Sequence, residues 1–133
     1  KFNNNQIKSL IKLSKYLIKK YKINQNNILG HSDIAPIRKK DPGEKFPWKY
    51  LSKNKVGIWY NFKKINKKKI YLDQNDLNKN TFLKKLNKFG YSIKYSNKNE
   101  FKKIIKNFQR RFRPKLIDGN IDNECVMIIK SLI

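Results

Sequence analysis

The sequence predicts an α/β fold, with helices packed on a mixed sheet, over its first 62 residues, followed by a small all-α bundle of three helices. Two observations predict this division. Near the N-terminus an amphipathic helical pattern precedes a short apolar strand, an order typical of α/β layers. Beyond residue 75, three segments repeat apolar residues at helical spacing. We therefore expect a first domain at 1–62, a linker at 63–75 and a second domain at 76–133.

The first helix is predicted over residues 6–21. Lysines occupy the face opposite its apolar side chains, and Asn4 or Asn5 could cap its start. Its apolar positions are Ile7, Leu10, Ile11, Leu17, Ile18 and Tyr21. Such a helix must pack on another element, and we expect that element to be a sheet.

A short strand is predicted to begin at Ile28 and to end at Gly30 and His31, the only histidine of the chain. Candidate sites gather at strand ends in α/β folds. Ten residues later, Asp41 precedes Pro42 and Gly43. A residue before proline is restricted to extended backbone, and glycine permits a sharp reversal, so Asp41 should lie at a stiff corner.

This spacing makes His31 and Asp41 candidate ligands of one zinc ion, because zinc accepts nitrogen and oxygen donors in a tetrahedron. Asp33 is better suited to capping the loop through local backbone amides. Lys39 would share a side of an extended segment with Asp41, where its ammonium could face an oxyanion. A lone histidine is more often a hydrogen-bonded structural residue, so the spacing by itself leaves both interpretations open.

The same stretch resembles a known family. Its motifs are GHSDIAP at 30–36, Arg38-Lys39-x-Asp41-Pro42-Gly43 at 38–43, and Phe-Pro-Trp at 46–48. In this order they resemble the C-terminal part of the zinc-dependent N-acetylmuramoyl-L-alanine amidases, the amidase type 2 family. The last motif also predicts a short helix with Pro47 in its first turn, and with Trp48 and Leu51 buried.

The resemblance implies that His31 and Asp41 are two of three zinc ligands and that Lys39 is the catalytic lysine. It implies hydrolysis of the amide between N-acetylmuramic acid and L-alanine in peptidoglycan or muropeptides, in the periplasm or at the outer membrane. The family's third ligand, a histidine on an early strand, and its catalytic glutamate have no counterpart upstream. We therefore expect a fragment of a longer product, inactive by itself.

Three helices are predicted in the second domain. Thr81 could cap the first, which should end at Gly90; Asn97 and Glu100 resemble a capping box for the second; Asp122 could cap the third. The elements F-Q-x-x-F at 108–112 and Asp-Gly at 118–119 are similar to those of the peptidoglycan-binding domain often appended to cell-wall hydrolases. By that similarity, Gln109 to Arg113 could face glycan or peptide stems.

The chain carries 33 Lys and Arg against 9 Asp and Glu, a formal net charge of +24. Such a charge favours polyanions as partners, but the lysines are spread over every segment among asparagine and isoleucine, so we expect no specific nucleic acid. No run approaches the roughly 18 apolar residues of a transmembrane helix. Two alternatives stay open: a non-catalytic peptidoglycan-binding remnant, and a basic nucleic-acid-binding protein.

Overall fold

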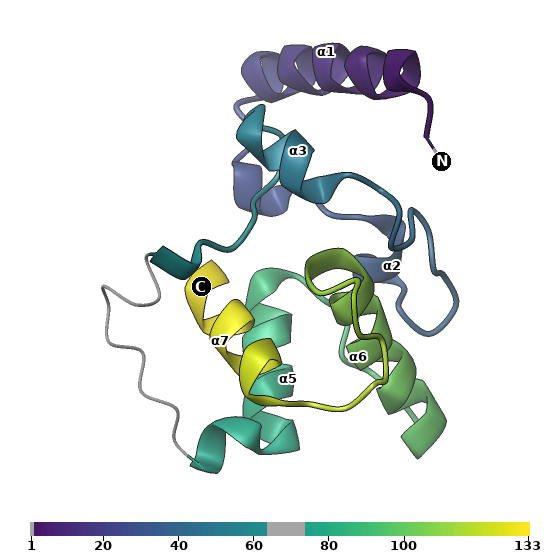
Figure 1. Cartoon of the computed structure of the whole chain (residues 1–133), viewed down its shortest axis with the longest axis vertical. Helices are drawn as coiled ribbons and strands as arrows, with labels where there is room; N and C mark the ends of the chain where they lie inside the picture. Colours follow the sequence, from purple (N-terminus) through teal and green to yellow (C-terminus); the bar gives the residue numbers. More distant parts are fainter. Residues whose placement is uncertain (1, 64–73) are drawn as a thin grey trace.

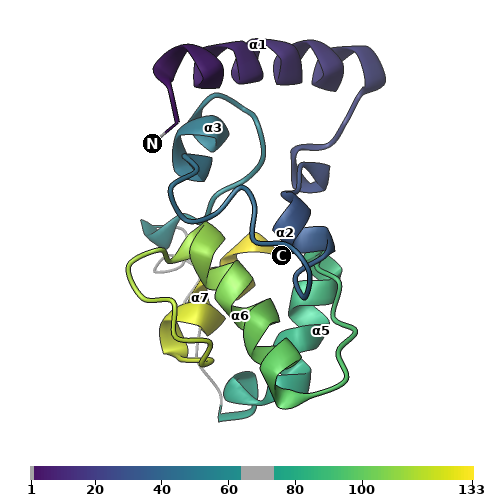
Figure 2. The ribbon, with the colours of Figure 1, turned by 90° about the vertical axis from the view of Figure 1, so that its right-hand side faces the viewer.

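The computed structural model describes residues 2–63 and 74–133, and its regular elements are helices. Helix α1 lies across one end, with α3 beneath it, and α5, α6 and α7 form a bundle at the other end (Figure 1). The view turned by 90° shows α2 and its loop between these two layers (Figure 2). The bounds are α1 Asn4–Tyr21, η1 Gln25–Asn27, α2 His31–Ile34, α3 Trp48–Lys53, η2 Gln74–Leu77, α5 Lys79–Phe89, α6 Lys98–Phe112 and α7 Asn123–Leu132.

The predicted α/β class is wrong, because residues 2–63 and 74–133 contain no strand and no sheet. Ile28 and Gly30 do have extended backbone. Side chains, however, take hydrogen bonds that a sheet would have formed: the Gly30 N–H donates to the Asp33 carboxylate at 2.7 Å, and the Ile28 carbonyl accepts from Arg111 at 3.3 Å. As a result, His31 begins α2 instead of ending a strand.

Helix α1 starts two residues earlier than predicted, and Asn3 caps it in a capping box with Gln6. One edge of the helix is buried in a small core that Ile7, Ile11, Leu51 and Val56 form with α3 and its flanking residues. Leu10 and Ile18 are partly buried against this core, but other apolar side chains of the helix face solvent. Leu13, Tyr16 and Tyr21 are each more than half exposed.

The three helices predicted after residue 76 are present. Local sequence correctly predicted the end of α5 and the starts of α6 and α7. Asn97 accepts from the Glu100 N–H and Asp122 from the Cys125 N–H, whereas α5 is capped by Asn78 and not by Thr81. Gly90 ends α5 with a φ of +113°, a conformation that favours glycine. A Cβ there would lie 2.8 Å from the Leu29 side chain, so the end of the helix touches the first half of the chain.

The larger core fills the bundle and extends beyond it. Partly buried side chains from the first half of the chain pack against it, namely Leu29, Ile37, Ile58, Trp59 and Tyr60. Residues 64–73 of the predicted linker lie outside the described residues, so the domain boundary stays a prediction. None of the helices in the described ranges is long and apolar enough to cross a membrane.

Of the residues expected to face glycan or peptide stems, Gln109 to Arg113, all but Arg110 are buried. Gln109 is fully buried and holds the 118–120 turn: its side-chain amide donates to the Asp118 carboxylate and the Asn120 carbonyl, and its oxygen accepts from the Gly119 N–H. Arg113 is also buried and forms an ion pair with Asp122. These side chains stabilise the bundle and are not accessible to a ligand.

Candidate active site

His31 and Asp41, predicted from their spacing, lie side by side. The His31 Nδ1 is 3.1 Å from the Asp41 Oδ2, and about half or more of each side chain is exposed. A backbone hydrogen bond of 2.9 Å from the Ser32 N–H to the Asp41 carbonyl joins the two segments that carry them. The pair is therefore both fixed at the backbone and open to a ligand from solvent.

Local turns bring Asp41 back to α2. The Ala35 carbonyl accepts from the N–H groups of both Arg38 and Lys39, which reverses the chain just after the helix. The Asp41–Pro42 peptide bond is cis, and Gly43 follows with a φ of +77°. The chain thus returns at Asp41 to the start of α2, where the Ser32 N–H donates to the Asp41 carbonyl.

The spacing of these two donor atoms fits a shared zinc ion. With metal–ligand bonds of about 2.0 to 2.1 Å, neighbouring ligands in a tetrahedron are separated by about 3.4 Å, close to the 3.1 Å observed here. A catalytic zinc site normally has three protein ligands. Across residues 2–63 and 74–133, however, no group of three His, Cys, Asp or Glu side chains could hold a metal ion.

Lys39 is half-buried and its backbone is fixed, since its N–H donates to Ala35 and its carbonyl accepts from Asn107. Among the described residues, no hydrogen bond or ion pair joins its ammonium to His31 or Asp41. Its predicted role beside the metal therefore remains a prediction.

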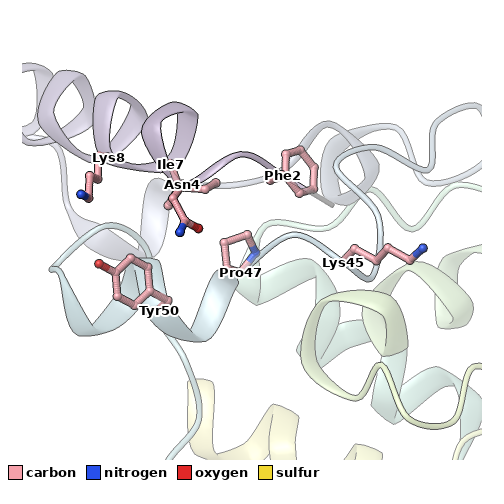
Figure 3. A pocket seen from close by; sticks show the side chains of 7 residues that line it. All are labelled: Phe2, Asn4, Ile7, Lys8, Lys45, Pro47 and Tyr50. Atoms are coloured by element: carbon pink, nitrogen blue, oxygen red, sulfur yellow. The ribbon is translucent and has the colours of Figure 1, made fainter.

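A groove of about 520 Å³ opens beside the pair and is mainly apolar. His31 and Asp41 lie on its lining with Leu29, Gly30, Pro42 and Trp48, among others. A separate hollow of about 390 Å³ lies between α1 and α3 (Figure 3). It is lined by Phe2, Asn4, Ile7, Lys8, Lys45, Pro47 and Tyr50, none of which was a candidate for chemistry.

A buried ion pair connects helix α2 to helix α6. Asp33 accepts from the Gly30 N–H and forms an ion pair with Arg111 of α6, and the two side chains are 1% and 2% exposed. The Arg111 guanidinium also stacks over the Trp48 ring at 4.0 Å. The predicted capping role of Asp33 thus extends to a contact with the bundle. Complete burial of Tyr91, and next the negative charge of Asp33, raise the pKa of the Tyr91 hydroxyl well above its usual range.

Helix α6 makes a second set of contacts with the same loop. The Asn107 side chain donates to the carbonyls of Pro36 and Lys39 at 2.8 and 2.9 Å. Its oxygen accepts from Arg110, whose Nε lies 3.7 Å from the Glu44 carboxylate. Residues about 70 positions downstream therefore hold the candidate site.

Sequence reasoning missed these supporting residues, although the chain offers one signal for the arginines. It contains only four arginines among 33 basic residues, and three of them fall at 110, 111 and 113. In a chain that uses lysine almost everywhere, this concentration indicates positions that need a planar guanidinium with several fixed donors. Two of the three, Arg111 and Arg113, are buried.

The comparisons with known proteins agree with the resemblance. Residues 1–44 match the Amidase_2 family model, described as N-acetylmuramoyl-L-alanine amidase. The chain is 35% identical over 133 residues to the N-acetylmuramoyl-L-alanine amidase AmiD of Escherichia coli strain K12. That match covers 96% of this chain and 47% of the relative, so the chain spans about half of that relative's length.

Two solved structures have the same fold over nearly the whole chain. One is E. coli AmiD in complex with the substrate anhydro-N-acetylmuramic acid-L-Ala-D-γ-Glu-L-Lys, with a TM-score of 0.86 and 34% identity over 98% of this chain and 52% of that one. The other is AMPDH3 from Pseudomonas aeruginosa, with a TM-score of 0.82 and 30% identity over 98% of this chain and 53% of that one.

Proposed function

We propose that this chain forms part of a zinc-dependent enzyme that hydrolyses the amide between N-acetylmuramic acid and L-alanine. Its homologues are N-acetylmuramoyl-L-alanine amidases, which supports membership of that amidase family. The observation that carries the proposal is the 3.1 Å separation of the His31 and Asp41 donor atoms in an exposed site beside a groove. The substrate is peptidoglycan or a muropeptide derived from it.

In this proposal His31 and Asp41 would hold the metal with the two side-chain atoms that face each other. When bound there, zinc would supply a water with a pKa lowered to about 7 and polarisation of the scissile carbonyl. The Nδ1 atom must be unprotonated to act as a ligand, so the site takes a neutral imidazole and an ionised carboxylate. The half-exposed side chains leave room for a substrate carbonyl to approach.

Lys39 is proposed to stabilise the tetrahedral oxyanion. The amide is unreactive because its carbonyl must become an oxyanion on the way to products, and an ammonium placed beside that oxygen lowers the barrier. Lys39 lies two residues before Asp41, and hydrogen bonds hold its backbone in place. Its long, flexible side chain can extend from there toward the proposed metal site. Lys39 would therefore be the catalytic residue that this chain contributes.

The chain alone supplies only part of such a site. A third metal ligand would have to come from outside residues 2–63 and 74–133, within which no group of three His, Cys, Asp or Glu side chains could hold a metal ion. In this proposal the general base for the water also comes from elsewhere. The same observation favours one alternative, a non-catalytic remnant in which the α5–α7 bundle binds peptidoglycan. Because Gln109, Arg111 and Arg113 are buried, such binding would use other surfaces of the bundle.

We expect the 133-residue chain to bind zinc weakly, with a dissociation constant above the micromolar range, and to release no peptide from muropeptides. Two ligands provide too few bonds to replace the hydration of the ion. Isothermal titration with zinc and chromatography of treated muropeptides measure both quantities. Sub-micromolar affinity would show that no further ligand is needed.

Incubation with purified sacculi separates the two candidate functions. A remnant would sediment with the sacculi and release no peptide. This would hold for the chain alone and for the full-length protein. An amidase would release peptide in the full-length protein, and chelation would abolish the release.

A further inference from the structure

We infer that Asn107, on α6, is a positioning residue for the candidate active site: it fixes the backbone of the loop that leads from His31 to Asp41. The inference deepens the proposed function and rests on it for one of its two readouts, zinc affinity. The other readout, local opening of the loop, is independent of any metal.

Both side-chain N–H donors of Asn107 are committed to this loop. A side-chain amide has two N–H donors, and here one donates to the Pro36 carbonyl at 2.8 Å and the other to the Lys39 carbonyl at 2.9 Å. The side chain is 1% exposed, so water cannot readily replace these bonds. Asn107 thereby closes the 36–39 turn across its two carbonyls.

A second anchor lies one turn further along α6. Arg111 bonds to Asp33 and to the Ile28 carbonyl, at the start of the segment that carries the site, whereas Asn107 bonds near its end. Residues four apart lie on one face of a helix. A single face of α6 therefore bonds to this segment both before and after His31.

The adjoining face of α6 packs into the core of the bundle. Ile104, Ile105, Phe108 and Phe112 are fully buried in its core. The helix cannot shift relative to the bundle without breaking this packing. The bundle therefore acts as the rigid base of the site, and the Asn107 amide links it to the backbone at Pro36 and Lys39.

Asn107→Ala, made in the 133-residue chain, tests the inference by amide hydrogen exchange measured with NMR. The informative amide is that of Ser32, which donates to the Asp41 carbonyl and reports whether the two site segments stay together. Loss of two buried hydrogen bonds should accelerate its exchange by about tenfold or more relative to amides of α5. If Asn107→Ala does not fold, Asn107→Ser, which keeps one donor, should give a smaller acceleration in the same amide.

Asn97→Ala is the matched control. It removes the cap of the same helix, through the bond to the Glu100 N–H, and touches nothing in the site loop. It should lower global stability but leave Ser32 exchange unchanged relative to α5. Equal acceleration in both variants, or none in Asn107→Ala, would reduce Asn107 to an ordinary core residue and overturn the inference.

Zinc affinity supplies the second readout. Asn107→Ala should weaken zinc binding by about tenfold, as expected for a group that orients a ligand without touching the metal, and Asn97→Ala should not. If the unmodified chain binds no zinc at all, the proposed function fails, while the exchange comparison still decides whether Asn107 positions the loop. Faster Ser32 exchange with unchanged zinc affinity would contradict the positioning of the ligands.

Discussion

Replacing Arg111 with methionine should lower the free energy of unfolding by about 3 to 5 kcal/mol, the largest stability effect expected in this chain. The substitution leaves the Asp33 carboxylate buried at 1% exposure without its cationic partner. It also removes the stacking on Trp48 and the bond to the Ile28 carbonyl. Urea denaturation followed by circular dichroism measures the change.

Glu44→Ala provides the control for this first prediction. It removes the exposed ion pair with Arg110, which should change stability by less than about 1 kcal/mol because solvent screens the pair. Combining Arg111→Met with Asp33→Leu should recover part of the loss, since no buried charge then lacks a partner. An Arg111→Met cost as small as that of Glu44→Ala would mean that the buried pair is not what ties the site to the bundle.

Replacing Lys39 with alanine should reduce turnover of the full-length protein by a few hundred-fold, equivalent to about 3 to 4 kcal/mol of transition-state stabilisation. Metal content should stay unchanged, because the proposed ligands are His31 and Asp41. The physical reason is loss of the only ammonium proposed to face the oxyanion. Steady-state hydrolysis of a muropeptide, with zinc measured by atomic absorption, tests both parts.

Lys40→Ala is the matched control for Lys39→Ala. Lys40 is the next residue and its side chain is exposed, so the substitution removes the same charge without touching Lys39. Its turnover should stay close to that of the unmodified protein. If the two variants behave alike, the effect is one of net charge, and Lys39 loses its proposed role. If Lys39→Ala also loses zinc, the lysine affects the metal site itself.

What the sequence could predict depended on how far apart the interacting residues lie. The Gly90 end of α5, the Asn97 cap and the Asp122 cap all involve partners within four residues, so local pattern was sufficient. The His31–Asp41 pair spans ten residues. It was predictable because the chain has one histidine, and because proline and glycine after Asp41 favour a reversal.

The strand prediction failed for a long-range reason. Ile28 and Gly30 are extended, as the predicted strand required, but the partners of their backbone groups are the side chains of Arg111 and Asp33. Arg111 lies 83 positions from Ile28, and nothing in the local sequence places α6 there. Asn107 was missed for the same reason, since its acceptors at Pro36 and Lys39 are about 70 residues away.

The most direct test follows the single imidazole of the chain by NMR during a zinc titration. Because His31 is the only histidine, its ring ¹⁵N signals need no assignment among alternatives. Saturable zinc binding should shift the Nδ1 resonance, and Asp41→Asn should weaken that binding by tenfold or more, while Glu44→Ala, which removes a carboxylate outside the proposed ligand pair, should still show the Nδ1 shift. An imidazole spectrum that zinc leaves unchanged, or an affinity that ignores Asp41→Asn, would contradict the shared metal site.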